Sequence, residues 1–501
     1  MATGKALDGK PYAGNPHVRF DEGEVAPATT PRRGSLLYIV RTSKMIMLGV
    51  VSSFAHAAFA VIGPTVSDVV QTVGSGGRLS VTYTLKDTAA VVTMDVETNT
   101  VDSAGVTNWV TIGHQFIGRS SGDVFKIVQP GTMRKVIWRA DRDWEGVETS
   151  PAHVRVVIRA VATNTPPDYM VCNLKTGERF YYDDADYLPG GIESDDYRKH
   201  LLLMRKIPAR GVVWHYGPPP HKLEYEAAYN KDYPVAFTRD YYMGVFEVTQ
   251  WQWNYVSVER GGYTARTYIP MFSGDTRPFD GGGNENQICP GYGIVGDGSA
   301  PPMPTGGDDD YKLNTTKCFL AKARELTGLG LYLHLPTQWQ WEYACRAGTM
   351  TAFNNGGELV SKTETQNDAL DLVGRYAGNG GIVDNGDGTK TTNGTVRVGS
   401  YAPNAWGLYD MHGNIMEWCR DRRGWGVPDG FDASEINVVR VDPAGPTNNA
   451  PGVIESHFCS RGGDYRSSPR ACASSWRGGS VQAWQGDAYR FGFRLCYTIH
   501  E

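Results

Sequence analysis

The sequence lacks several features that mark well-known functional classes. It has no excess of positive charge, since 49 Lys and Arg stand against 54 Asp and Glu for a formal net charge of -5. Such a balance offers no basic face to a phosphate backbone, so we expect no nucleic-acid partner. None of the eight cysteines forms the CxxC pair of a structural zinc site. After residue 60 no apolar run reaches the roughly 18 residues that predict a transmembrane helix.

Glycine and proline are the residues that stand out. The 501 residues include 60 Gly and 28 Pro, while 41% are hydrophobic and 21% are charged. This composition is typical of a globular protein rich in turns. Because the chain is longer than one ordinary domain, we expect two or three folded units that contain β-structure.

Residues 41–60 have the pattern of a secretory signal peptide. Basic residues come first, an apolar run from Met45 to Phe54 follows, and the segment ends in Ala58-Phe59-Ala60. The alternative is a short buried helix. We therefore expect export to the bacterial periplasm or the extracellular space. Residues 1–40 are polar and rich in Pro and Gly, and we expect a non-native or disordered leader there, with translation starting near Val40.

Residues 61–165 alternate apolar and polar side chains in short runs, for example Leu79–Leu85, Ala90–Val96 and His153–Val161. Turn-forming clusters separate these runs, so the pattern predicts an all-β sandwich of immunoglobulin or fibronectin type. No nucleophile or ligand cluster is present, which favours a spacer or docking role. Residues 166–225 are expected to connect this sandwich to a second domain over 226–501.

The second domain is rich in loops and has few helical patterns. Two helices are predicted, over Lys317–Leu326 and over Gln338–Arg346, and Thr337 is the expected N-cap of the second. Long loops in a compact domain need something to hold them. Metal ions, disulfides and buried tryptophans are the available means.

Five ordered motifs in the second domain resemble one known family. They are Tyr242–Thr249, Leu335–Thr349, Pro403–Trp418, Arg461–Tyr465 with Cys472 and Arg477 behind it, and Gly492–Arg494. Together they are similar to the formylglycine-generating enzymes, also called sulfatase-modifying factors. The resemblance covers residues 226–501 and implies an α+β, loop-rich modified C-type-lectin-like fold. The predicted sandwich lies outside it.

The resemblance also implies a structural calcium site. Its ligands would be the side chains of Asp410 and Glu417 with the carbonyls of Gly413 and Ile415. Oxygen donors on a tight loop suit Ca²⁺. The alternative is a plain turn, in which Asp410 accepts backbone amides and Glu417 pairs with an arginine. Asn379 is the best candidate for a second calcium site in the loosely matching region 374–394.

The family oxidises a substrate cysteine to formylglycine with O₂, using two cysteines that hold Cu(I). Counted from Arg461, the first of these positions is Ser467 and the second is Cys472. A serine hydroxyl is a hard, weak donor whereas Cu(I) prefers thiolates, so we expect no copper site. Asp464 also replaces a family serine. Cys472 could then be a remaining nucleophile or a structural cysteine.

Two disulfides follow from the resemblance. The first would join Cys318 to Cys496. The second would start at Cys345, but its family partner falls on Arg477, so Cys472 or Cys459 would have to substitute. Iron-dependent relatives use three histidines on a helical pattern that this sequence lacks. His215 and His221 are separated by three prolines and cannot share a helix face.

The sequence thus predicts an exported, calcium-braced binding or scaffold module without formylglycine-generating activity. Its ligand would be an unidentified protein or glycan. The alternative is a divergent metal- and O₂-dependent oxidase or oxygenase of the same superfamily.

Overall fold

The structure is a computed structural model of the 501-residue chain. It describes residues 63–500, with gaps at 75–76, 102, 148, 220–221, 224–231, 260–269, 282–317, 381–382, 385–389, 392–393, 425–436, 444–452 and 479–487. The leader and signal peptide predicted over 1–60 lie outside these residues. Within the described ranges, no helix has both the length and the apolar character needed to cross a membrane.

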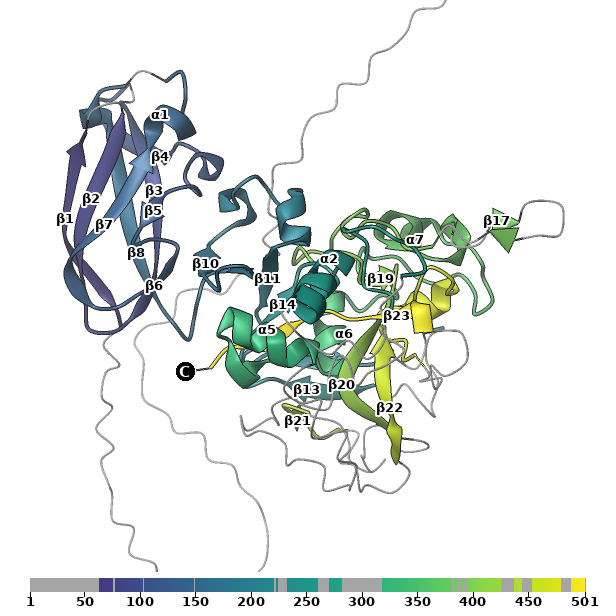
Figure 1. Ribbon diagram of the computed structural model, residues 1–501. Helices are drawn as coiled ribbons and strands as arrows, with labels where there is room; N and C mark the ends of the chain where they lie inside the picture. Colours follow the sequence, from purple (N-terminus) through teal and green to yellow (C-terminus); the bar gives the residue numbers. More distant parts are fainter. Residues whose placement is uncertain are drawn as a thin grey trace, which may run out of the picture. The chain divides into compact units, whose positions relative to one another are not determined.

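The first described part is built of antiparallel strands in two sheets (Figure 1). One sheet has the order β1 (Thr65–Val73), β2 (Arg78–Lys86), β7 (Gly131–Arg139), β5 (Ser121–Gly122). In the other, β3 (Ala90–Val101) pairs with β4 (Thr107–Thr111), β6 (Lys126–Val128) and β8 (Val154–Ala162). Alternate side chains of β2, such as Leu79, Val81 and Tyr83, enter a core shared with β3. The predicted all-β sandwich is therefore present.

A six-stranded antiparallel sheet organises the rest of the chain. Its order is β10 (Arg179–Tyr182), β9 (Tyr169–Asn173), β11 (Leu201–Ile207), β14 (Tyr241–Gly244), β24 (Cys496–Thr498), β15 (Leu333–His334). Three of these strands come from residues 166–225, which the sequence had suggested were a connecting region. The tyrosine-rich stretch there is strand because Tyr181 and Tyr182 are buried as core side chains.

Small sheets and short helices surround this one. The sheets are β12 (Val213–Tyr216), β13 (Tyr233–Ala236) and β21 (Arg440–Val441); β22 (Val453–Arg461), β20 (Met416–Gly424) and β23 (Phe491–Gly492); β16 (Gly374–Arg375) and β19 (His412–Gly413); and β17 (Val383–Asp384) and β18 (Lys390–Thr391). The helices are α2 (Gln250–Trp253), α5 (Phe319–Thr327), α6 (Gln338–Arg346) and α7 (Asp368–Val373), whereas α1 (Ala140–Asp143) belongs to the sandwich, where it contacts β2 and β7 (Figure 1). Many loops join them, as the glycine content predicts.

Helix α6 has the predicted bounds and the predicted cap. The Thr337 hydroxyl accepts a hydrogen bond from the Gln340 amide at 3.1 Å, and the Gln340 side chain accepts one from the Thr337 amide at 3.0 Å. This reciprocal capping box satisfies two amides that the first turn leaves unpaired. The helix then buries Trp339 and Trp341. Helix α5 begins two residues later than predicted, with Cys318 as its N-cap.

The two faces of the six-stranded sheet pack different cores. Tyr242 and Tyr497 point into a cluster that includes Cys318 and α5, whereas Cys496 points into the cluster around Trp339 and Trp341. Successive side chains of a strand point to opposite faces, so the sheet lies between Cys318 and the Cys496 thiol. Cys496 is unpaired. The expected Cys318–Cys496 disulfide is therefore wrong, and the partner of the disulfide-bonded Cys318 lies outside the described residues.

The second expected bridge is also absent. Cys345, Cys459 and Cys472 are all buried, and none of them takes part in a disulfide. Cys345 Sγ lies 3.8 Å from the Met411 carbonyl oxygen. Arg477, which stands where the family has the partner of Cys345, contacts Cys459 instead. Its Nη2 lies 3.8 Å from Cys459 Sγ.

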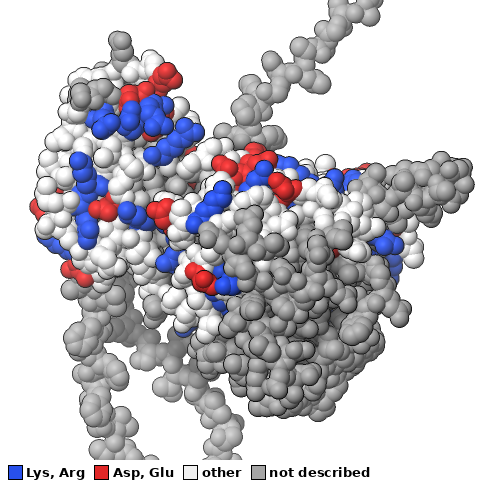
Figure 2. Space-filling model, in the orientation of Figure 1, with Lys and Arg blue, Asp and Glu red and all other residues white. Residues whose placement is uncertain are grey.

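Charge on the visible surface is mixed. Figure 2 shows Lys and Arg side chains interspersed with Asp and Glu side chains over the described part of this face. Several are paired, such as Arg155 with Glu97 at 2.6 Å across β8 and β3. Cross-strand pairs of opposite charge stabilise a sheet modestly.

Candidate functional site

Three carboxylates meet in the interior of the second part of the chain: Glu247, Asp410 and Glu417. All three are buried, with relative exposures of 0%, 1% and 1%. Glu247 follows β14, Asp410 precedes β19, and Glu417 lies at the start of β20. Each carboxylate raises the electrostatic cost of ionising the others. This group of residues is called the carboxylate cluster below.

The loop that carries Asp410 to Glu417 is tight because of its backbone. Asp410, Gly413 and Asn414 all have left-handed φ values, of 55°, 87° and 58°. A Cβ at Gly413 would lie 2.0 Å from the Arg375 carbonyl oxygen, so only glycine fits between β19 and β16. The Asn414 side chain then reaches back and donates to Glu247 Oε2 at 2.6 Å.

Glu417 is held on both oxygens. Arg494 donates from Nη2 to Oε1 and from Nε to Oε2, each at 2.6 Å, and Trp341 Nε1 donates to Oε2 at 2.7 Å. The arginine pairing considered as the alternative to calcium ligation is thus present. Arg494 also donates to the carbonyls of Gly244 and Tyr409, each at 3.0 Å. The Glu417–Arg494 pair therefore joins four separate segments of the chain: the end of β14, helix α6, the loop from Tyr409 to Glu417 and the segment that carries Arg494.

Asp410 is only half satisfied. Its Oδ2 accepts a hydrogen bond from the Gly399 amide at 2.5 Å, but Oδ1 has no hydrogen-bond partner within the described residues. Burial raises the pKa of Asp410 to about 6. Burial and the neighbouring Asp410 and Glu417 also raise the pKa of Glu247 well above its ordinary value. With all three carboxylates ionised, the cluster would carry more negative charge than Arg494, its directly bound cation, can balance, so a proton or a further cation is needed to compensate it.

Asn379 caps its own turn. Its Oδ1 accepts from the Tyr376 amide at 3.0 Å, and its Nδ2 donates to the Gly374 carbonyl at 2.6 Å. Both side-chain atoms are therefore engaged locally, in the segment that includes β16. Val383–Asp384 and Lys390–Thr391 pair as a short antiparallel hairpin downstream.

Ser467 occupies a polar site rather than a metal-binding one. Its hydroxyl donates to Asp464 Oδ1 at 2.7 Å and accepts from the Asp464 amide at 3.0 Å. Arg490 pairs with the same carboxylate, with Nη2 at 3.1 Å from Oδ1 and a closer contact through Nε. Asp464, which replaces a family serine, thus binds both the Ser467 hydroxyl and the Arg490 guanidinium.

Cys472 is close in sequence to Ser467 but lies in an apolar cluster. Its thiol is fully buried beside Tyr376 and Leu370. A Cβ at Gly463 would lie 2.7 Å from its sulfur, so the thiol packs against the Gly463 backbone. Burial, with a contribution from Asp464, raises the pKa of the thiol well above its ordinary value. A protonated thiol beside a neutral hydroxyl does not fit Cu(I), which needs thiolate donors.

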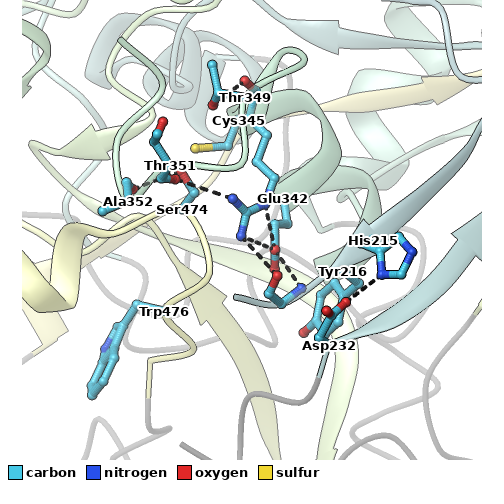
Figure 3. A network of polar contacts seen from close by, with 12 residues as sticks. His215, Tyr216, Asp232, Glu342, Cys345, Thr349, Thr351, Ala352, Ser474 and Trp476 are labelled. Atoms are coloured by element: carbon cyan, nitrogen blue, oxygen red, sulfur yellow. Dashed lines mark hydrogen bonds and ion pairs between the residues drawn. The ribbon is translucent and has the colours of Figure 1, made fainter. Parts of the chain in front are cut away.

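A second buried network holds the segment that precedes this site (Figure 3). Glu342 of α6 accepts from Arg346 Nε and from the Gly217 amide, each at 2.9 Å, and lies 3.1 Å from Arg461 Nη2. Arg461 also donates to the Tyr216 hydroxyl at 2.6 Å. Because Arg461 ends β22, the network fixes the point from which residues 462–472 depart.

Among the described residues, the one group of three or more His, Cys, Asp or Glu side chains that could hold a metal ion is His114, Asp184 and Asp186, which includes neither His412 nor His215. His412 is buried, with Nδ1 2.7 Å from the Cys472 carbonyl and Nε2 3.1 Å from the Asn354 amide nitrogen, and burial lowers its pKa to about 4. It is thus a neutral structural residue. His215 contacts Asp232 at 2.6 Å, as Figure 3 shows, while its possible partner His221 lies outside the described residues.

Sequence reasoning missed Glu247, Arg494 and Arg490 as parts of these sites. Glu247 and Arg494 lie within motifs that the sequence does contain, so a charged residue inside an apolar run was the available signal. Arg490 had no such signal, because it lies outside every motif.

Comparison with known proteins finds one matching family model, several curated relatives and several similar solved structures. A family model described as "Sulfatase-modifying factor enzyme 1-like domain" matches residues 221–499. A formylglycine-generating enzyme of Thermomonospora curvata is 32% identical over 146 residues, covering 28% of this chain and 43% of that protein. The mouse (Mus musculus) formylglycine-generating enzyme is 31% identical over 169 residues, covering 33% and 39%. A Chlamydia pneumoniae protein named serine/threonine-protein kinase pkn1 is 32% identical over 170 residues, covering 33% and 21%.

The chain thus spans less than half the length of these curated relatives. Among solved structures, Treponema denticola variable protein 1 is 21% identical and covers 59% of this chain and 95% of that chain, with a TM-score of 0.37. PvdO from Pseudomonas aeruginosa is 19% identical and covers 60% and 95%, with a TM-score of 0.38.

Proposed function

Because this chain belongs to the sulfatase-modifying factor family, whose model matches residues 221–499, we propose that it is a binding or scaffold member without formylglycine-generating activity. The observation that carries the proposal is the set of contacts around Ser467. Its hydroxyl is bound by Asp464, and Asp464 is bound by Arg490. A position that must supply a thiolate for copper is therefore a neutral hydroxyl in a closed polar group.

The buried thiol of Cys472 supports the same proposal. It lies in an apolar cluster, fully removed from solvent, and its raised pKa keeps it protonated near neutral pH. A nucleophilic or metal-bound cysteine needs an accessible thiolate. The oxidase alternative has no comparable observation in its favour.

Copper uptake tests this proposal. In an anaerobic titration of the reduced full chain against a chromogenic Cu(I) chelator, we expect the chelator to keep the copper, because the Ser467–Cys472 pair offers no two thiolates. Tight binding of one Cu(I) per chain would contradict the proposal if Cys472→Ala abolished it. Cys172→Ala, which removes a buried thiol from a different core cluster, is the matched control.

We also propose that calcium braces the domain at the carboxylate cluster. Asp410 has a buried oxygen with no partner among the described residues, and three carboxylates face one directly bound guanidinium. The donors are oxygens, which Ca²⁺ prefers. Asp410 and Glu417, with the carbonyls of Gly413 and Ile415, would hold the ion. Bound calcium would neutralise the excess negative charge and so stabilise the fold.

Calcium addition to chelator-treated protein should raise the midpoint of thermal unfolding. At a hundredfold excess over the dissociation constant, binding to the folded state alone stabilises by about 2.7 kcal/mol. Asp410→Asn should remove most of this response, because it removes the unpartnered oxygen's charge. Asp368→Asn, which changes an exposed carboxylate in the same domain, should keep it. A wild-type midpoint that ignores millimolar calcium would rule out the brace.

Export is the third part of the proposal, and it rests on the pattern of residues 41–60. A calcium brace is consistent with export, since extracellular modules commonly bind calcium in the range of about 10⁻⁴ to 10⁻³ M. N-terminal sequencing of the exported protein should begin at Val61. A first residue far upstream of Val61 would show that no signal peptide is removed there.

A further inference from the structure

A cavity of about 580 Å³ opens on the sheet face opposite α6, and neither Ser467 nor the carboxylate cluster contributes to its lining. Tyrosines from several strands line it: Tyr181 from β10, Tyr242 from β14 and Tyr497 from β24. Tyr332, from the turn before β15, and His500 add two further rings. Its volume lies in the range of roughly 300–1,000 Å³ that small-molecule sites occupy.

The aromatic wall is fixed by contacts between its own rings. His500 stacks on Tyr332 with ring centroids 3.8 Å apart and planes 5° apart. Its Nδ1 lies 3.2 Å from the Tyr497 hydroxyl. Tyr497 in turn stacks on Tyr242, with centroids 6.3 Å apart. Flat aromatic surfaces that are already rigid bind the face of a ring at little entropic cost.

Positive charge in the cavity has no counterpart. Arg179 lines it two residues before Tyr181, and so on the same face of β10. Arg179 pairs with no carboxylate in the part of the chain that the structure describes, and none of the described lining residues is acidic. Burial raises the pKa values of Tyr181 and Tyr497, and the positive charge of Arg179 acts in the opposite direction. Burial lowers the pKa of His500, and the charge of Arg179 lowers it further. A half-buried guanidinium that has no carboxylate partner can donate its N–H groups to an anionic ligand.

A smaller hollow of about 200 Å³ continues from the first and shares Ile499 and His500 with it. It adds Arg239 to the cationic groups around His500. Its one acidic residue, Asp240, already accepts the amides of Ala209 and Arg210, each at 2.8 Å. The surroundings of His500 therefore favour a negatively charged ligand.

We infer that this cavity binds a small ring compound carrying a carboxylate, with the ring against the tyrosine faces and the carboxylate on Arg179. Arg suits a carboxylate because its planar guanidinium donates two parallel hydrogen bonds. A sugar acid and an aromatic acid share this chemistry, since both offer a flat apolar face beside one negative group. The inference does not depend on the proposed function, because the cavity contains no residue of either site described above.

Calorimetric titration of the full chain tests it with four probes: glucuronate and its uncharged analogue glucose, and 4-hydroxybenzoate and its uncharged analogue phenol. We expect at least one acid to bind at millimolar concentration or below, and its uncharged analogue to bind at least about tenfold more weakly. Binding of glucuronate alone would identify a sugar acid as the ligand class. Binding of 4-hydroxybenzoate alone would identify an aromatic acid, and binding of both would support the shared chemistry.

Arg179→Gln should weaken binding of the acid at least about tenfold, while Lys362→Gln, which removes an exposed charge outside the cavity, should not change it. Tyr332→Ala is a second variant, in a half-buried position, that should weaken binding by removing the ring that holds His500. The inference is overturned if neither acid binds, if glucose or phenol binds as tightly as its acid, or if a folded Arg179→Gln protein binds unchanged.

Discussion

The buried ion pair between Glu417 and Arg494 is the interaction on which the second part of the chain depends. Two hydrogen bonds of 2.6 Å join the two side chains, and Trp341 of α6 adds a third to the carboxylate. Arg494 also binds carbonyls at the end of β14 and at Tyr409. Removing one partner of such a pair typically costs about 3–5 kcal/mol, because a charge is left buried.

That pair also explains why the neighbouring acids are unbalanced. Once Arg494 is committed to Glu417, Asp410 and Glu247 remain buried without a bound cation among the described residues. A native fold tolerates such a cluster when an ion or a proton compensates it. The buried acids are the reason for proposing a bound calcium ion at this place in the fold.

The segment after β22 carries the positions at which this sequence departs from the family pattern. Asp464 and Ser467 differ from the family pattern together, and in the fold they bind each other and Arg490. Two changes that satisfy one another form a stable polar group rather than a damaged copper site. Membership of the family therefore says more about architecture than about activity here.

The sequence predicts local structure better than it predicts distant contacts. Helix α6 follows from Thr337 and Gln340, which are three residues apart and cap the helix by themselves. The predicted Cys318–Cys496 disulfide was wrong because the face of the sheet to which the Cys496 side chain points depends on how β24 pairs with β14 and β15.

The residues of the candidate site were also only partly predictable from the sequence. The motif around Asp410 was visible in the sequence, and so was the replacement at Ser467. Glu247 joins Asp410 only through the packing of segments far apart in the chain, and Arg490, which lies outside every motif, contacts Asp464 from 26 residues away. Tertiary contacts of this kind leave no periodic pattern for a sequence to show.

Oxidation of a peptide that carries the CxPxR motif of sulfatases tests the central claim most directly. The full chain would be incubated with the peptide, O₂ and copper, beside a formylglycine-generating enzyme as a positive control, and the products weighed by mass spectrometry. The account predicts an unchanged cysteine in the peptide. Formation of the aldehyde by this chain, and its loss in Cys472→Ala, would contradict it.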